Sequence, residues 1–444
     1  MLLLPLPRDP WPPVRSQRAA RAAVTAVYAL VLLAATAEVW RSLVRVRLVV
    51  FHGYVTLGQV VLLPYSDPYS LHMNTWPPFF LFVAAGLALV ARVSETLALG
   101  LWQVAGVLAV WGCCKLAAEL FLDGEDRIAF WPRGPQRLAF GSGLVLVPFL
   151  MTSRLFQEQL QHTQINAQVL FLVLFAFHRF RRARDGQGAL ALAVASSVKA
   201  LPALFLPYLA YKHAWRPLAW TLGWLVLLNV ALPAAIFGPA RAIAHWRSWR
   251  VVAAREVSDP VPQHSNQSLV AALKRLLTTR GGERDPVQYA AAEWSGAGVQ
   301  RLFYAIAGLA AIGVAWLFRR HPPGLACAAT SAELAICLGA MVVVDPLAWK
   351  AHYVALIVPY TFAWWALSRM PPGAPGRAWR WALWWGSFAT ITLSAPALVG
   401  RHARDVLESA NVILIGALML LALVVWLLAD VDAAASGSRE LISL

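Results

Sequence analysis

The strongest constraint on this chain is its series of apolar runs, several of them about as long as the hydrocarbon core of a bilayer is thick. Charged residues make up only 14% of the 444 positions, whereas an average soluble domain has about 25%. Short alternating segments separated by turns, which are typical of an outer-membrane barrel, are not visible. The pattern therefore predicts an all-α, polytopic transmembrane bundle of about ten to twelve helices.

The net charge of +16 does not indicate a nucleic-acid partner. Arginine and lysine occur in short clusters between the apolar runs, where they first report topology and only secondarily attract anionic membrane lipids. No aromatic and basic platform for nucleic acid accompanies them. The four cysteines lie inside apolar runs without zinc-like or redox spacing, so we expect neither a metal nor a cofactor.

The charge clusters divide the chain into a membrane domain with two tails. We predict a cytoplasmic N-terminal tail at residues 1–21, a transmembrane domain at 22–430 and a C-terminal tail at 431–444. Within the domain, we expect a first non-cytoplasmic loop at 41–78 and a larger one at 239–298.

Some helices must be shorter than a full span. Leu190–Tyr211 carries Lys199 near its middle and a basic cluster on each flank, which predicts a hairpin of two half-length helices. The cluster HRFRRARD, residues 178–185, falls outside the cytoplasm if every earlier run is a full span. At least one earlier run must therefore be re-entrant or interfacial, and the shortest are Phe79–Val90 and Val169–Phe177.

Polar groups in so apolar a chain are informative, because a charge at mid-bilayer costs about 2.5–3.5 kcal/mol or more. Residues 50–78 carry histidines, a carboxylate and prolines, so protein or a water-filled cavity must cover them. We expect this opening stretch to be a loop over an active site. The polar motifs are SDPY (66–69), TWPP (75–78), TQIN (163–166), VKALP (198–202), NQSL (266–269) and DPLAWKAHY (345–353).

In this order, the motifs resemble glycosyltransferase family 87, membrane enzymes of the GT-C class. The family includes polyprenol-phosphate-mannose-dependent α-mannosyltransferases, and the resemblance covers residues 45 to 365. It implies a GT-C-like bundle that moves a hexose, with mannose expected, on the non-cytoplasmic side. The implied partners are a polyprenyl-phosphate-sugar donor and a glycolipid or glycan acceptor. Abundant Ala and Arg with scarce Lys suggest a GC-rich bacterial genome, hence a bacterial inner membrane.

The match departs from the family at important positions. Aligning Tyr54 with the family tyrosine puts Val50 where the family has its expected catalytic aspartate. The family's Gly-Gln-x-Asn begins here with Thr163, and its late Ser-Pro-x-x-Trp-x-x-His begins with Asp345 and has His352 one residue late. A catalytically inactive homologue is therefore an alternative to an active enzyme.

Sugar transfer to a hydroxyl needs a base, and a phosphate leaving group benefits from cations or amides that bind its charge. Asp67 is the nearest carboxylate in the opening stretch and is the predicted base. The plainer interpretation is a turn aspartate before Pro68. Asp345 and Glu158 are weaker alternatives.

Two further residues complete the predicted catalytic set. Lys199 lies inside an apolar run, so it must face a cavity or snorkel, and we predict that it meets the donor phosphate. His352 is predicted to contact the leaving phosphate or the acceptor, although a lone interfacial histidine is often structural. The predicted substrate-binding residues are Tyr54, Tyr69, Gln164, Asn166, Asn266, Gln267 and Asp345.

Simpler roles exist for several of these residues. Gln164 and Asn166 can hydrogen-bond between helices, and the segment 266–268 can cap the helix that follows it. A transporter or lipid flippase, with Lys199 lining a path, is the rival class of protein. No inverted repeat with matching broken helices supports that class.

Overall fold

The structure is a computed structural model. It describes residues 49–64, 66–71, 74–122, 143–258, 260, 262–278, 285–287, 290–325 and 329–440, with positions 26, 30, 33, 34, 37 and 41. The predicted tail at 1–21, most of the first apolar run and the linker at 123–136 lie outside the described residues. Side chains are described up to residue 432.

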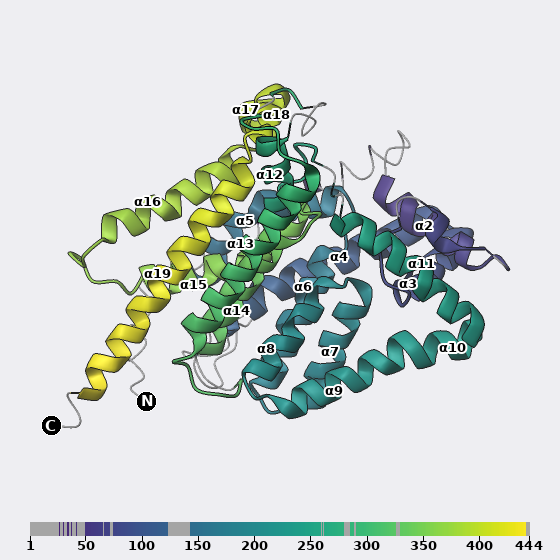
Figure 1. The fold of residues 1–444 in the computed structure, drawn as a ribbon, viewed down its shortest axis with the longest axis horizontal. Helices are drawn as coiled ribbons and strands as arrows, with labels where there is room; N and C mark the ends of the chain where they lie inside the picture. Colours follow the sequence, from purple (N-terminus) through teal and green to yellow (C-terminus); the bar gives the residue numbers. More distant parts are fainter. Residues whose placement is uncertain are drawn as a thin grey trace.

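The fold is all-α, as predicted: 79% of the chain is helical, and no strand occurs within the described ranges (Figure 1). The helical segments outnumber the expected ten to twelve because turns and π-helical stretches divide several apolar runs. The helices are α2 (Val49–Val61), α3 (Phe80–Val93), α4 (Glu95–Glu119), α5 (Gly143–Gln161), α6 (Asn166–Phe180), α7 (Asp185–Val198), α8 (Phe205–Tyr211), α9 (Trp215–Val226), α10 (Leu232–Phe237), α11 (Pro239–Ser258), α12 (Leu269–Leu277), α13 (Gly296–Phe318), α14 (Ala329–Val344), α15 (Ile357–Leu367), α16 (Arg377–Phe388), α17 (Pro396–Val399), α18 (Arg401–Ser409) and α19 (Val412–Glu440).

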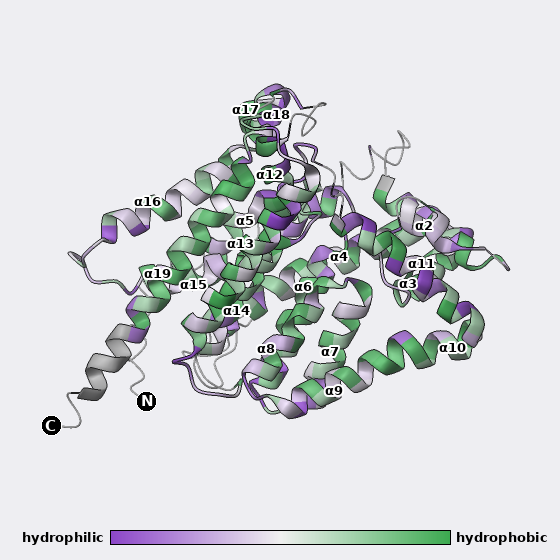
Figure 2. Ribbon diagram, in the orientation of Figure 1, coloured by the Kyte–Doolittle hydropathy of each residue, from purple (hydrophilic) through white to green (hydrophobic). Residues whose placement is uncertain are grey.

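Four helical segments in the described part are long and apolar enough to cross a membrane, and hydrophobic residues dominate their ribbons (Figure 2). In three of them most of the apolar surface is not covered by protein, as expected for lipid-facing helices. The segments are Glu95–Glu119, Trp215–Phe237, Gly296–Phe318 and Val412–Asp432.

The predicted half-length hairpin is present. The first helix of the hairpin, α7, ends at Val198, a short 3₁₀ turn (η2, Leu201–Leu204) follows Lys199, and α8 returns as the second. Among the early helices, α3 and α6 have 14 and 15 residues, which is shorter than a full span.

The basic clusters gather at one end of these helices. Arg216 Nε lies 3.7 Å from Asp185 Oδ2, and the Gly324 N–H donates to the Lys212 carbonyl oxygen over 2.7 Å. We call this the basic end. At the other end, near α12, α17 and α18 in Figure 1, lie the turns that precede α6 and follow α14. We call this the site end.

Both predicted loops contain helices. The opening stretch, expected to be a loop, starts with the helix α2, which packs on α3 where Gly58 meets Ala84. The sequence VVFHGYVTLGQVV has only two strongly polar side chains in 13 residues, so it buries one face readily. The larger loop holds α11 and α12, and α19 runs on into the predicted C-terminal tail as far as Glu440.

Candidate active site

Four polar side chains from three separate parts of the chain meet at the site end. Lys199 Nζ donates to Asn166 Oδ1 over 2.9 Å and lies 3.6 Å from Asp345 Oδ2. His352 Nδ1 lies 3.3 Å from the same Asp345 oxygen. Because α7, α6 and α14 each begin or end here, residues far apart in sequence converge. We call these four residues the lysine cluster.

The amide of Asn166 is held by the turn between α5 and α6. Its Nδ2 donates to Gln159 Oε1 and to Gln164 Oε1, each over 3.3 Å. Thr163 begins this turn with φ of +52°, a left-handed conformation that favours glycine. The corresponding family motif has glycine where this chain has Thr163. The left-handed turn explains why glycine is favoured at this position.

The backbone that carries Asp345 is held by Asn266 and Gln267. Asn266 Nδ2 donates to the Pro346 carbonyl oxygen over 3.0 Å, and Asn266 Oδ1 accepts from the Ala348 N–H over 3.1 Å. The Gln267 N–H donates to the Ala348 carbonyl oxygen over 2.9 Å. Both side chains thus bind protein and position the loop beside the lysine cluster, and direct substrate binding by them remains a prediction.

A second charged group lies next to the lysine cluster. Glu408, 1% exposed, accepts from Arg154 Nη2 over 2.9 Å and from Lys350 Nζ over 3.0 Å. Lys350 Nζ also lies 3.6 Å from Glu158 Oε1, and Lys350 is only two residues from His352. Of this group, the sequence indicated only Glu158, as an alternative base. Arg154, a charge that follows the apolar first half of α5, was the available signal for this group.

Three of these residues also resemble a metal site. His264, Asp405 and Glu408 each offer a ligand atom, and these atoms lie within 4.8 Å of one another. However, Arg154 and Lys350 contact Glu408, and Arg404 Nη2 lies 2.5 Å from Asp405 Oδ1. A divalent cation would compete with three cationic side chains, so we assign these carboxylates to ion pairs.

Asp67 occupies the turn before a short 3₁₀ helix (η1, Pro68–Ser70). Its Oδ1 accepts from the Tyr69 N–H over 3.0 Å, and its Oδ2 accepts from Ser248 Oγ over 3.1 Å. Its side chain makes no hydrogen bond with the lysine cluster within the described part of the chain. The Tyr69 hydroxyl donates to the Trp76 carbonyl oxygen over 3.1 Å.

Tyr54, buried in α2, connects the opening stretch to the turn before α6. Its ring lies 5.0 Å from the ring of Trp76 and 5.2 Å from that of Trp102, between centroids. Trp102 Nε1 in turn donates to the Thr163 carbonyl oxygen over 2.8 Å. Tyr54 therefore packs as part of the wall that supports the lysine cluster.

Helix α11 connects the opening stretch to the hairpin that carries Lys199. Trp249 Nε1 donates to the Thr75 carbonyl oxygen over 3.1 Å. Trp246 Nε1 donates to the backbone carbonyl oxygen of Asn229 over 2.6 Å. Asn229 Nδ2 then donates to Ser197 Oγ over 2.6 Å, two residues before Lys199. Since Ser248 also binds Asp67, one helix holds both predicted catalytic regions. Asn229, a lone amide in an apolar run, was not among the predicted residues.

Apolar helices long enough to cross a membrane, with charged side chains buried among them, define the class of this protein, a polytopic helical membrane protein. Residues 74–346, more than half of the chain, match the model of glycosyltransferase family 87. The chain therefore belongs to glycosyltransferase family 87 and is a membrane glycosyltransferase. No curated protein and no solved structure gives a significant match.

The matched range contains most of the site. Gln164, Asn166, Lys199 and Asp345 fall inside it, whereas His352 lies six residues beyond its end. Asp67 precedes its start, in keeping with the departure of the opening stretch from the family pattern.

Proposed function

We propose that this glycosyltransferase moves a hexose, with mannose expected, from a polyprenyl-phosphate donor to a hydroxyl of a lipid or glycan acceptor. The observation that carries the proposal is the lysine cluster, which holds an ammonium group, an amide and an imidazole together at one end of the helices. Asp345 lies 3.6 Å from the ammonium group and favours its charged form, and the Lys199 side chain is 22% exposed.

The lysine cluster suits a phosphate leaving group. As the bond from the anomeric carbon to the phosphate oxygen breaks, negative charge grows on the phosphate, and Lys199 stabilises it. His352 can add a hydrogen-bond donor beside that charge, and Asn166 orients the ammonium group of Lys199 by accepting its hydrogen bond. Asp345 holds Lys199 and His352 in place, because its Oδ2 faces both of them.

Asp67 is the base in this proposal. A carboxylate beside an ammonium group is a weaker proton acceptor, which disfavours Asp345 in that role. Within the described residues, the hydrogen bonds to the Asp67 side chain come from neutral donors, Tyr69 N–H and Ser248 Oγ. It would take the proton of the acceptor hydroxyl while the oxygen attacks the anomeric carbon.

The same proposal puts the site end on the non-cytoplasmic side. Arginine and lysine clusters around Asp185, Lys212 and His321 lie together at the basic end, which by the positive-inside rule faces the cytoplasm. The composition that suggests a GC-rich bacterial genome favours the inner membrane as the location.

The test is sugar transfer by the purified full-length protein from polyprenyl-phosphate-mannose. Lys199→Met should lower turnover by about 10²-fold or more, the scale of losing one preorganised charge-stabilising group. Asp67→Asn should lower it by about 10²–10⁴-fold, as for the loss of a general base, without weakening donor binding. Arg319→Gln, at the basic end, is the matched control and should leave turnover unchanged.

Each contrary outcome has a definite meaning. A fully active Asp67→Asn variant would move the base elsewhere, and a fully active Lys199→Met variant would contradict the role of the lysine cluster. Movement of labelled lipid across a vesicle without sugar release would favour a flippase. Absence of transfer from every donor would indicate an inactive homologue, consistent with Val50 at the family's aspartate position.

A further inference from the structure

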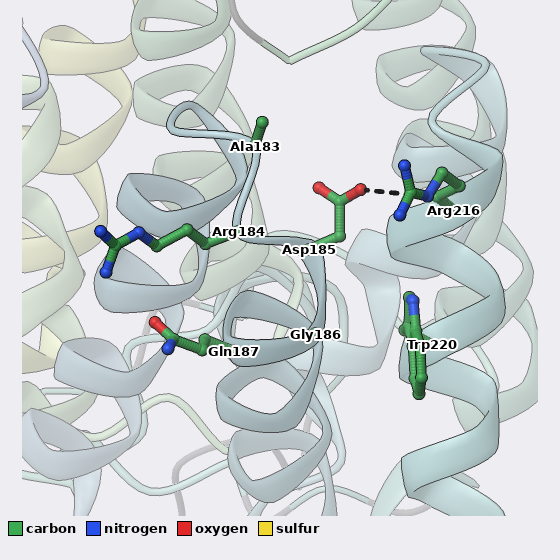
Figure 3. A pocket seen from close by; sticks show the side chains of 7 residues that line it. All are labelled: Ala183, Arg184, Asp185, Gly186, Gln187, Arg216 and Trp220. Carbon is green, nitrogen blue, oxygen red and sulfur yellow. Dashed lines mark ion pairs between the residues drawn. The ribbon is translucent and has the colours of Figure 1, made fainter.

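A pocket of about 450 Å³ opens at the basic end, around the ion pair between Asp185 and Arg216 (Figure 3). Its walls are the turn between α6 and α7, the first turn of α7 and the first two turns of α9. Arg184, Asp185 and Arg216 supply its charged groups, and the indole of Trp220 lies one turn beyond Arg216.

The pocket opens beside the start of a candidate membrane span. Its α9 wall is the start of Trp215–Phe237, a candidate membrane span whose surface is largely uncovered by protein. Trp215 and Trp220 are 60% and 51% exposed there, as is typical of interfacial tryptophans. Arg216 thus sits at the polar rim, while Trp220 extends the wall towards the apolar region.

The pocket has cationic groups available to a ligand. The side chain of Arg184 makes no hydrogen bond or ion pair with any residue in the described ranges. Arg216 pairs with Asp185 at 3.7 Å, but its side chain is 84% exposed, so that pair is weak. The adjoining segment 178–185 holds four arginines and one aspartate, which gives the region a positive potential.

We propose that this pocket binds the head group of an anionic phospholipid of the surrounding membrane. Arg216 would bind the phosphate, because a guanidinium group matches its oxygen atoms in geometry and charge. The Arg184 side chain points to the other side of the α7 turn (Figure 3) and attracts the anionic lipid through its charge. Trp220 packs against the glycerol and the first acyl carbons. Asp185, which faces Arg216 in Figure 3, can accept a hydrogen bond from a head-group hydroxyl, which favours a lipid such as phosphatidylglycerol.

This lipid site is separate from the transfer site. The pocket begins at the first residue of α7 and Lys199 follows its last, so about 20 Å of helix lies between them. A head group in the pocket contacts α7 and α9 together. Binding there stabilises the packing of these helices and does not take part in the chemistry.

The test is lipid retention by the detergent-solubilised full-length protein, measured by native mass spectrometry and by thermal unfolding. We expect phosphatidylglycerol to be retained and to stabilise the protein, whereas phosphatidylcholine does so weakly. Arg184→Gln and Arg216→Gln should each weaken phosphatidylglycerol binding by roughly fivefold, the effect of one arginine near an anionic lipid surface. Trp220→Leu should weaken it as well.

Arg319→Gln is the matched control, since Arg319 also lies beside a tryptophan at the basic end but lines no part of this pocket. Equal binding of the two lipids, or equal losses in Arg319→Gln and Arg216→Gln, would overturn the proposal. Inorganic phosphate provides the remaining comparison. If it stabilises the protein as strongly as phosphatidylglycerol does, and Trp220→Leu has no effect, the pocket binds a free anion and the lipid assignment fails.

Discussion

At the scale of single residues, Asp345 is the member of the lysine cluster whose two possible roles, orienting its neighbours or acting as the base, can be distinguished most directly. Asparagine at this position keeps the shape and the acceptor for the Leu347 N–H but removes the charge facing Lys199 and His352. We expect Asp345→Asn to lower turnover by about 10–100-fold, because both partners lose the anion that orients them. The measurement is the pH dependence of turnover. Turnover of the variant should still fall at low pH as it does in the wild type, because Asp67 supplies the base and gains its proton there.

The same pH profile can contradict this role of Asp345. If turnover of Asp345→Asn no longer falls at low pH, then Asp345 is itself the base, because that fall is caused by the base gaining its proton. Leu347→Ala alters the same loop without removing a charge and serves as the control.

Thr163 allows a stability prediction at one backbone position. Its φ of +52° is a conformation in which a β-branched residue is strained by about 1–2 kcal/mol. Glycine removes that strain but gives up roughly 0.5–1 kcal/mol of chain entropy. Thr163→Gly should therefore leave the free energy of unfolding unchanged or raise it by about 1 kcal/mol, measured by thermal unfolding in detergent.

The comparison for Thr163 is Thr361→Gly, in the middle of α15, where the backbone is helical. That variant should lower stability, because glycine is unfavourable in a helix interior and the buried hydroxyl is lost. Equal effects of the two substitutions would show that the left-handed turn carries no strain.

At the residue level, the sequence singles out polar side chains that interrupt an apolar run, and their roles in transfer stay predictions. Lys199 and Asn166 were predicted in this way, and the structure brings them within 2.9 Å of each other. Gln159 was missed, although it lies in the same polar patch, because its sequence position alone does not show that it faces Asn166. Which of several neighbouring amides faces a site depends on helix rotation, and packing sets that rotation.

At the scale of elements, the contact between α2 and α3 depends on one glycine. A Cβ at Gly58 would overlap the carbonyl oxygen of Ala84 and come within 2.7 Å of Ala88 Cβ. Gly58→Ala must push the two helices apart, and overpacking of this kind costs about 1–3 kcal/mol. The measurement is the thermal stability of the purified protein.

Gly53, in the same helix, is the matched control. A Cβ there would meet nothing within 4 Å among the described residues. Gly53→Ala should be neutral or stabilising by up to about 1 kcal/mol, from helix propensity alone. A stable Gly58→Ala variant would mean that α2 and α3 do not pack as closely as the structure has them.

The hairpin and the two loops show what element-level prediction can do. Basic clusters on both flanks of Leu190–Tyr211 were enough to predict that the run folds back, because charge placement constrains topology. The helices α2 and α11 were not predicted. Histidine and glutamine interrupt the apolar pattern of α2, and α11 carries four arginines, so both resembled loop. Their helical form depends on the surfaces they pack against.

At the scale of the whole molecule, a buried ionic group joins distant helices at the basic end. His321 Nδ1 lies 2.7 Å from Glu333 Oε1 in α14, and its Nε2 lies 3.1 Å from Asp432 Oδ2 in α19. Lys212 Nζ donates to the same Glu333 oxygen over 2.9 Å. The group therefore joins the α8 end, the segment after α13, α14 and α19, which are separated by up to 220 residues, 212 to 432.

This group gives the protein a pH-dependent stability. Hydrogen bonds to Asp432 and then to Glu333 raise the pKa of His321 from 6.5 to about 9, so the folded state binds its proton more tightly than the unfolded chain does. The resulting stabilisation is complete below about pH 6.5 and is lost as the pH rises through about 9. We expect the free energy of unfolding to fall over that range by at most about 3 kcal/mol.

Thermal unfolding in detergent between pH 6 and 10 measures this loss. His321→Gln should lower stability at pH 6 and make it nearly independent of pH, because the titrating group is gone. His402→Gln, an exposed histidine in α18 at the other end, should keep the wild-type profile. If His321→Gln retains the full decline towards pH 9, a different group holds the proton, and the four segments are not joined through a charged imidazole.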